Sequence, residues 1–167
     1  MPVQVLTAPP SSKKWDIWLT ILGALLLPLI LYVVAGLDRG AEWSALPFWL
    51  QVVALVGMVL GIAITDWAMW ANRFFSGTVR IQEDRGHTVA AGGPYRAVRH
   101  PGYVGTLVFE VFTPLLLGSW WAWIPGLLSA VLLLVRTALE DRTLQEELEG
   151  YEAYARQVRY RLLPGLW

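Results

Sequence analysis

The chain has 167 residues, the length of one domain, and 56% of them are hydrophobic. Its mean hydropathy of +0.48 exceeds that of ordinary soluble domains. The formal net charge is zero, which excludes a general electrostatic attraction to nucleic acid. There are no cysteines, which excludes disulfides, thiolate metal sites and cysteine nucleophiles. The composition therefore predicts an integral membrane protein.

The apolar residues fall into runs that divide a single membrane domain into successive parts. We expect residues 1–14 to form a flexible polar tail, and residues 15–71 hold two runs long enough to cross ~30 Å of hydrocarbon. Residues 72–100 are the one extended polar segment. Residues 101–142 predict a helical hairpin with a tight turn, and 143–167 an amphipathic tail. The expected fold is all-α, with about four transmembrane helices and a cytoplasmic tail.

The first apolar run has an alternative interpretation. Lys13 and Lys14 precede it, as positive residues precede the apolar core of a signal peptide. The run from Trp15 to Gly36 is too long for such a core and has no convincing small-x-small cleavage motif. These features favour a retained helix.

Lysine and arginine are distributed unevenly around the predicted helices. With four spans, Arg39 lies alone on one side, and Arg136 lies near the opposite end of the last helix. The basic residues that gather on that opposite side are Lys13, Lys14, Arg73, Arg80, Arg85, Arg96, Arg99, Arg142, Arg156, Arg159 and Arg161. Because basic residues favour the cytoplasmic side, we expect both termini and the 72–100 segment in the cytoplasm, at a bacterial inner membrane.

Ionisable residues within the apolar runs are candidates for a site, because they are costly in a membrane. Arg136 and Glu140 lie four apart on one helical face, so they either pair at the membrane surface or line a polar cavity. Glu110 lies near the middle of the third helix. It is either a buried, hydrogen-bonded carboxyl group or a contact for the substrate.

The two histidines do not have the spacing of a metal site. His87 and His100 together with Glu140 match no ligand pattern, so we predict no metal. His100 follows Arg99 and precedes Pro101, which favours the first turn of a helix. It is therefore placed to donate to a ligand near that helix N-terminus.

A series of motifs resembles the isoprenylcysteine carboxyl methyltransferase family. They are Gly93-Pro94-Tyr95, Arg99-His100-Pro101-x-Tyr103-x-Gly105, a hydrophobic hairpin, Arg136-x-x-x-Glu140-Asp141 and Tyr151-x-x-Tyr154. Members of this family are integral membrane enzymes that use S-adenosylmethionine and are related to phospholipid methyltransferases. The similarity covers about residues 78–167, and the first two helices carry no comparable signature.

The resemblance implies a cytoplasmic cofactor pocket. Its border would consist of Gln82, His87, Thr88, Val89, Ala90, Tyr95, His100, Pro101, Gly102 and Tyr103, and Glu140 would hold a polar group of the cofactor. Arg136 matches the family's arginine that faces the methyl acceptor. Asp141 stands where the family often has a second glutamate, and the chain is shorter than the eukaryotic members.

The resemblance thus implies a membrane methyltransferase that moves a methyl group from S-adenosylmethionine to a small lipophilic acceptor, either an isoprenylcysteine-like carboxylate or a lipid, at the cytoplasmic leaflet. Arg136 and Glu140 are the predicted catalytic residues, and Arg136 and Glu110 the predicted substrate contacts. The alternatives are an NADPH-dependent reductase of the sterol type and a non-enzymatic membrane binding module.

Overall fold

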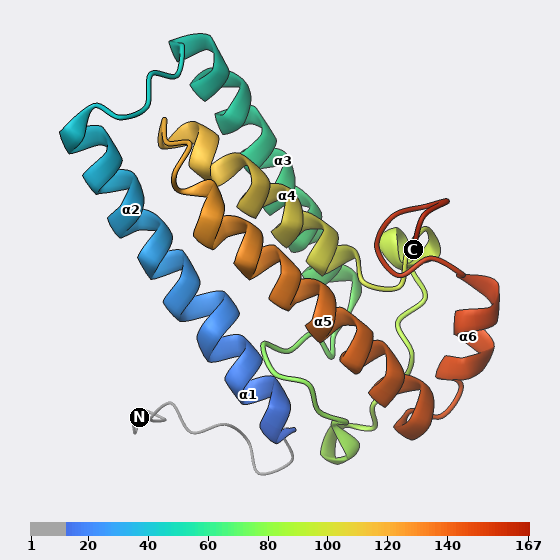
Figure 1. Cartoon of the computed structure of the whole chain (residues 1–167). Coiled ribbons are helices and arrows are strands. Elements are labelled where there is room, and N and C mark those ends of the chain that lie inside the picture. The colour runs from blue at the N-terminus through green and yellow to red at the C-terminus, as the bar shows by residue number, and fades with distance from the viewer. Residues whose placement is uncertain (1–12) are drawn as a thin grey trace, which may run out of the picture.

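The computed structural model describes residues 13–167, which form a helical bundle without a strand. The first long helix joins α1 (Lys14–Thr20), a π-helical turn η1 (Ile21–Leu26) and α2 (Leu27–Ala41) without a break (Figure 1). The other long helices are α3 (Phe48–Ala71), α4 (Pro101–Leu116) and α5 (Trp123–Glu147). Short helices follow in the polar parts: η2 (Glu83–Arg85), η3 (Gly93–Arg96) and α6 (Tyr151–Gln157).

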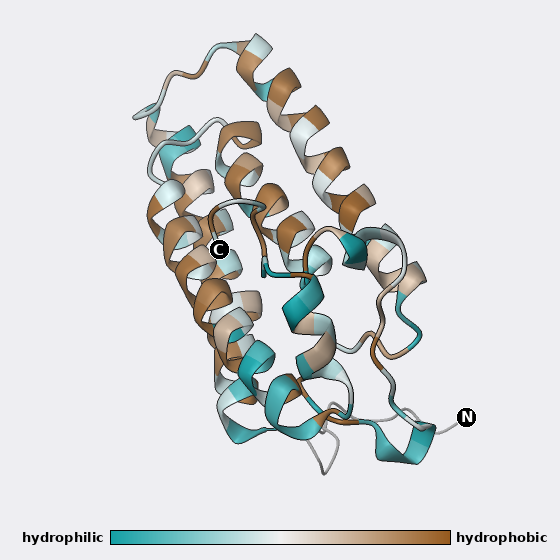
Figure 2. Cartoon of the chain, turned by 90° about the vertical axis from the view of Figure 1, so that its right-hand side faces the viewer, coloured by the Kyte–Doolittle hydropathy of each residue, from teal (hydrophilic) through white to brown (hydrophobic). Residues whose placement is uncertain are grey.

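Three helices of the described chain are long and apolar enough to cross a membrane: Lys14–Ala41, Phe48–Ala71 and Trp123–Glu147. The helix α4 is apolar but has only 16 residues, about 24 Å at the α-helical rise. Brown, hydrophobic ribbon covers the upper part of the bundle, and teal, hydrophilic ribbon gathers at the lower end (Figure 2). The membrane prediction is thus confirmed, with three spans by length and composition; a fourth span stays a prediction.

The backbones of α3 and α4 touch, which places the start of α4. A Cβ atom on Gly61 would lie 2.7 Å from the carbonyl oxygen of Gly105, and one on Gly105 would lie 2.5 Å from that of Gly61. Thr65 also donates to the carbonyl of Gly102 at 3.3 Å. Gly61 and Gly105 therefore allow the two helices to approach closely.

The π-helical turn lies directly before Pro28. The N–H of Leu27 donates to the carbonyl of Leu22, five residues back, so the next bond in this register would run from residue 28 to Gly23. Pro28 has no N–H, and the carbonyl of Gly23 is left without that donor. The hydroxyl oxygen of Ser129 on α5 lies 2.7 Å from it instead. Such turns inside α-helices often accompany functional sites.

Three boundaries differ from the sequence-based expectation. The first helix continues past Gly36 to Ala41, and buried Asp38 at its end accepts hydrogen bonds from Ser44 and Ser119. Helix α5 continues past residue 142 to Glu147. The tail is helical only over α6 and then folds irregularly back onto the bundle, where Leu162 is buried. The end of the first helix is thus tied to Ser119, 81 residues away from Asp38, by a contact that has no local signature.

Candidate active site

Asp141 on α5 holds together the polar end of the bundle. The carboxylate is fully buried, and Arg99 binds both of its oxygens, with Nε at 2.7 Å from Oδ1 and Nη2 at 2.8 Å from Oδ2. Further contacts to the same carboxylate come from His100, Gln145, Tyr151 and Arg161. A buried charge needs such compensation. One side chain thereby joins the start of α4, helix α6 and the C-terminal segment.

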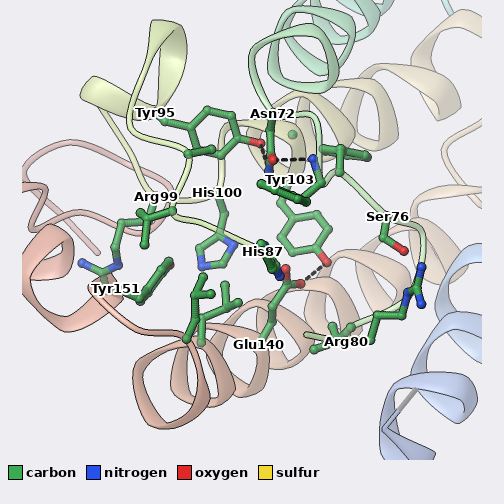
Figure 3. Close-up of a pocket in the computed structure, with 18 of the residues that line it drawn as sticks. Asn72, Ser76, Arg80, His87, Tyr95, Arg99, His100, Tyr103, Glu140 and Tyr151 are labelled. Atoms are coloured by element: carbon green, nitrogen blue, oxygen red, sulfur yellow. Dashed lines mark hydrogen bonds between the residues drawn. The ribbon is translucent and has the colours of Figure 1, made fainter. Parts of the chain in front are cut away.

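A pocket lies next to this cluster, between the 72–103 segment, the polar end of α5 and α6 (Figure 3). Its walls are aromatic and apolar with a few polar groups, which is typical of small-molecule sites. The lining residues are Asn72, Phe74, Phe75, Ser76, Thr78, Val79, Arg80, His87, Val89, Ala90, Tyr95, Arg99, His100, Gly102, Tyr103, Glu140, Leu144, Leu148, Tyr151 and Tyr154.

Tyr103 and Glu140 form the polar centre of the pocket. The phenol of Tyr103 donates a hydrogen bond to Oε2 of Glu140 (Figure 3). The ring of Tyr103 lies nearly parallel to that of His100, with centroids 5.7 Å apart and an interplanar angle of 9°. Because Asp141 holds the imidazole of His100 at Nε2, the two rings have fixed positions. The pocket therefore offers a carboxylate beside two rigid aromatic rings.

Three further tyrosines supply neutral phenols to the pocket. Asn72 donates to the hydroxyl of Tyr95 at 3.3 Å, and Tyr154 donates to the carbonyl of Tyr95 at 2.7 Å. Burial raises the pKa of Tyr95, Tyr151 and Tyr154 above the usual range of a tyrosine. These phenols consequently stay protonated at neutral pH. Tyr151 and Tyr154 contact each other edge to face, with centroids 5.4 Å apart.

His87 lines the pocket as a neutral imidazole. Burial lowers its pKa, and the positive charges of Arg80 and Arg85 lower it further. Its Nδ1 lies 3.3 Å from the backbone N–H of Gln82 and accepts from it, which assigns the proton of the neutral ring to Nε2. The ring also packs on Phe74, with centroids 4.6 Å apart.

Arg136 does not pair with Glu140, although the two share a helical face. Its Nε donates to Oδ1 of Asp16 at 2.6 Å, and its Nη2 donates to the carbonyl of Gly77 at 2.7 Å. The guanidinium lies over the Tyr103 ring, 5.5 Å from the centroid. Arg136 thus lies behind Tyr103, outside the residues that line the pocket, and leaves Glu140 to the phenol.

The structure brings most of the predicted cofactor residues together. His87, Val89, Ala90, Tyr95, His100, Gly102, Tyr103 and Glu140 all line the pocket, whereas Gln82, Thr88 and Pro101 do not. The buried amide of Gln82 donates to the carbonyl of Phe74 at 2.6 Å and accepts from Arg85 at 2.7 Å, so it maintains the shape of the segment. Thr88 is exposed, and Pro101 is buried at the start of α4.

Several lining residues have little or no signal in the sequence. Asn72, Phe75, Ser76 and Arg80 come from the loop after α3, and Leu144 and Leu148 come from the end of α5. Asn72 stands at the end of a long apolar run, and this position is the only feature of its local sequence that suggests a functional role. The apolar residues look like ordinary core positions in sequence.

Glu110 lies apart from this pocket, in a second cavity that shares no lining residue with it. That cavity is bounded by Ala24, Pro28, Leu31, Tyr32, Thr106, Phe109, Glu110, Thr113, Gly126 and Ser129. The hydroxyl oxygen of Ser129 lies 2.8 Å from Oε1 of Glu110, while Oε2 is buried without a partner in the described chain. The structure does not bring Glu110 together with Arg136 and Glu140.

The fold and the site define a class of protein. It is a helical membrane protein with a pocket at the polar end of its bundle, lined by aromatic rings and a carboxylate. The chain matches the model of the isoprenylcysteine carboxyl methyltransferase (ICMT) family over residues 52–146, more than half of its length. It therefore belongs to this family, and the resemblance noted in the sequence is confirmed.

Relatives with this family's name are similar to parts of the chain. The protein-S-isoprenylcysteine O-methyltransferase of Homo sapiens is 30% identical over 144 residues, 76% of this chain and 49% of that protein. A "Probable protein-S-isoprenylcysteine O-methyltransferase" of Oryza sativa subsp. indica is 36% identical over 72 residues, 42% of this chain and 38% of that protein. Protein-S-isoprenylcysteine O-methyltransferase A of Arabidopsis thaliana is 31% identical over 71 residues, 42% of this chain and 36% of that protein. The chain spans less than half the length of each.

Proposed function

We propose that the protein transfers the methyl group of S-adenosylmethionine to the carboxylate of a lipophilic acceptor of the isoprenylcysteine type. The observation that carries this proposal is the pairing of Tyr103 with Glu140 in a pocket walled by aromatic rings, with Arg136 over the ring of Tyr103. Both catalytic candidates and most of the lining residues lie within the family match over residues 52–146, and Leu148, Tyr151 and Tyr154 lie just beyond it. The names of the relatives support the acceptor class.

The residues of the pocket suit the proposed donor. Tyr95, His100 and Tyr103 present aromatic faces, which attract a sulfonium cation. Glu140 offers carboxylate oxygens to hydroxyl or amino groups. Val89, Leu144 and Leu148 supply apolar contacts for a flat ring. The buried Gln82 and Pro101 would support this wall from behind rather than bind the donor.

The transfer needs positioning more than acid–base chemistry. S-adenosylmethionine supplies a methyl group on a positively charged sulfur. An acceptor carboxylate oxygen forms a bond to that carbon, the C–S bond breaks, and its electron pair stays on sulfur. The product is a neutral ester, so no proton must leave. Arg136 would orient the acceptor carboxylate, and the pocket would exclude water. For an amine acceptor, Glu140 would be the nearest base.

The arrangement in the membrane supports a meeting of soluble donor and lipid-borne acceptor. The pocket lies at the polar end of the bundle, where the basic 72–100 segment also lies. By the positive-inside rule this end faces the cytoplasm, and the acceptor enters from the adjoining leaflet. We retain the bacterial inner membrane and the contact of Glu110 with the acceptor as predictions. The cavity around Glu110 is mostly apolar, which suits a lipophilic chain.

A transfer assay tests this proposal. Detergent-purified protein is incubated with methyl-labelled S-adenosylmethionine and either a farnesylated cysteine derivative with a free carboxylate or phosphatidylethanolamine. Label in a base-labile ester of the first acceptor supports the proposal. Label on the phospholipid amine alone would show that the acceptor is a lipid amine instead of a carboxylate. No transfer to either acceptor by folded protein would contradict the proposal.

A further inference from the structure

Asp16 in the first turn of α1 is fully buried, and both of its carboxylate oxygens bind groups near the pocket. Oδ1 accepts from Nε of Arg136 at 2.6 Å. Oδ2 accepts from the backbone N–H of Val79 at 2.7 Å. Both partners lie far from Asp16 in the sequence: Arg136 is 120 residues away and Val79 is 63 residues away. Asp16 lies outside the region of the family match.

The contact with Asp16 fixes the position of the Arg136 guanidinium. An arginine four residues before a glutamate on a helix has that glutamate as its nearest natural partner. Asp16 and the carbonyl of Gly77 bind Arg136 on its other side, which leaves Glu140 to the phenol of Tyr103. The carboxylate of Asp16 therefore keeps the two catalytic candidates apart.

The same carboxylate fixes one wall of the pocket. Val79 lines the pocket together with Ser76 and Arg80. The backbone of Val79 is bound on both sides, because its N–H donates to Asp16 and its carbonyl accepts from the N–H of Lys13 at 3.3 Å. The start of the first helix thus fastens the 76–80 segment to the bundle.

We propose that Asp16 is a positioning residue of the active site, which aims Arg136 at the acceptor and holds the 76–80 segment in place. The first helix is then part of the acceptor site, although it carries no family motif. This inference rests on the proposed function, because its kinetic test measures transfer to the proposed acceptor. The Asp16–Arg136 contact itself can be tested without turnover.

The kinetic test compares Asp16→Asn with a matched control. The asparagine keeps an oxygen for Val79 but loses the charge that binds Arg136. We expect the KM for the farnesylated cysteine acceptor to rise about tenfold or more, since removing one partner of a buried charge pair is costly. Asp16→Glu should recover part of the loss. Glu147→Gln breaks the exposed Lys13–Glu147 contact, which also joins α1 to α5, and should leave KM unchanged.

A double variant separates positioning from general damage. In an Arg136→Lys background, the further change Asp16→Asn should have little effect on transfer, because the residue it acts through is already altered. Fully additive effects, or equal losses in Asp16→Asn and Glu147→Gln, would overturn the inference. Binding of S-adenosylhomocysteine by calorimetry shows that each variant is folded.

A readout without turnover keeps this inference distinct from the proposed function. With ¹⁵N-arginine labelling, the Nε–H signal of Arg136, assigned by its loss in Arg136→Lys, should exchange slowly with water in the wild type. It should shift or broaden in Asp16→Asn. A fast-exchanging Arg136 signal in the wild type overturns the inference. Wild-type protein without transfer activity but with a protected Arg136 signal would contradict only the proposed function.

Discussion

Arg99 binds Asp141 through two parallel hydrogen bonds of 2.7 and 2.8 Å, between the start of α4 and the polar end of α5. The side chain of Arg99 is only 7% exposed and that of Asp141 is inaccessible. Nη1 of the same arginine donates to the carbonyls of Val158 and Arg159, both at 2.8 Å. The pocket therefore depends on one buried ion pair that holds its helices and the C-terminal segment together.

Asp141→Asn should destabilise the fold by about 3–5 kcal/mol, because it leaves Arg99 buried without its counter-charge. Thermal unfolding in detergent measures the loss. Arg142→Ala at the neighbouring position removes an exposed pair with Glu146 and should change stability by less than about 1 kcal/mol. Equal melting temperatures for Asp141→Asn and the wild type would refute the structural role of the pair.

Gly61→Ala should also destabilise the bundle, since its Cβ would lie 2.7 Å from a backbone oxygen of α4. Overpacking of this kind costs about 1–3 kcal/mol. Gly36→Ala is the matched control, because a Cβ at that position meets no atom within 4 Å. Unfolding of the two variants side by side tests the contact of α3 with α4, and a Gly61→Ala protein as stable as Gly36→Ala would contradict it.

His87 should make the stability of the protein depend on pH. Burial and the nearby arginines lower its pKa in the folded state below the ordinary value of 6.5, so the unfolded chain takes up the proton more readily. The contribution of neutral His87 is therefore complete above about pH 6.5 and declines as the pH falls through the folded-state pKa.

The measurement is the unfolding midpoint between pH 5 and 7.5, about the range in which histidine titrates. The difference between the wild type and His87→Asn should shrink as the pH falls. A difference that is constant across this range would show that the pKa of His87 is the same in the folded and unfolded states.

Glu110 should carry a proton within the bundle. The hydroxyl oxygen of Ser129 lies 2.7 Å from the carbonyl of Gly23 and 2.8 Å from Oε1 of Glu110, but a hydroxyl has one proton to donate. Both contacts are hydrogen bonds only if Glu110 supplies the second proton. Infrared spectra should contain a protonated-carboxyl band that Glu110→Gln removes. The loss of only a carboxylate band in that variant would contradict this assignment.

Local patterns predicted most of the helices and much of the pocket. The predicted apolar stretch, residues 15–71, ends where α3 ends, at Ala71, and the motif from Arg99 to Gly105 placed the start of α4. Periodicity and turn residues act over a few neighbours, so they indicate elements well. His100 and Glu140 stand out from their local sequence, Tyr103 only through the family resemblance, and all three line one pocket.

Long-range pairing explains what the sequence did not reveal. The spacing of Arg136 and Glu140 favours a pair, but Asp16, 120 residues from Arg136, binds the arginine instead. Asp141 is a modest departure from the family motif in sequence and the centre of the polar cluster in the structure. No local pattern specifies which of several carboxylates a given arginine will meet.

The most direct test of the account is a calorimetric titration of the folded protein with S-adenosylhomocysteine and with NADPH, repeated for Glu140→Ala and Arg136→Ala. We predict saturable binding of S-adenosylhomocysteine alone, lost in Glu140→Ala and kept in Arg136→Ala, which loses transfer instead. Binding of NADPH in place of the adenosyl compound would favour a reductase. Binding of neither, or full affinity in Glu140→Ala, would contradict the proposed donor pocket.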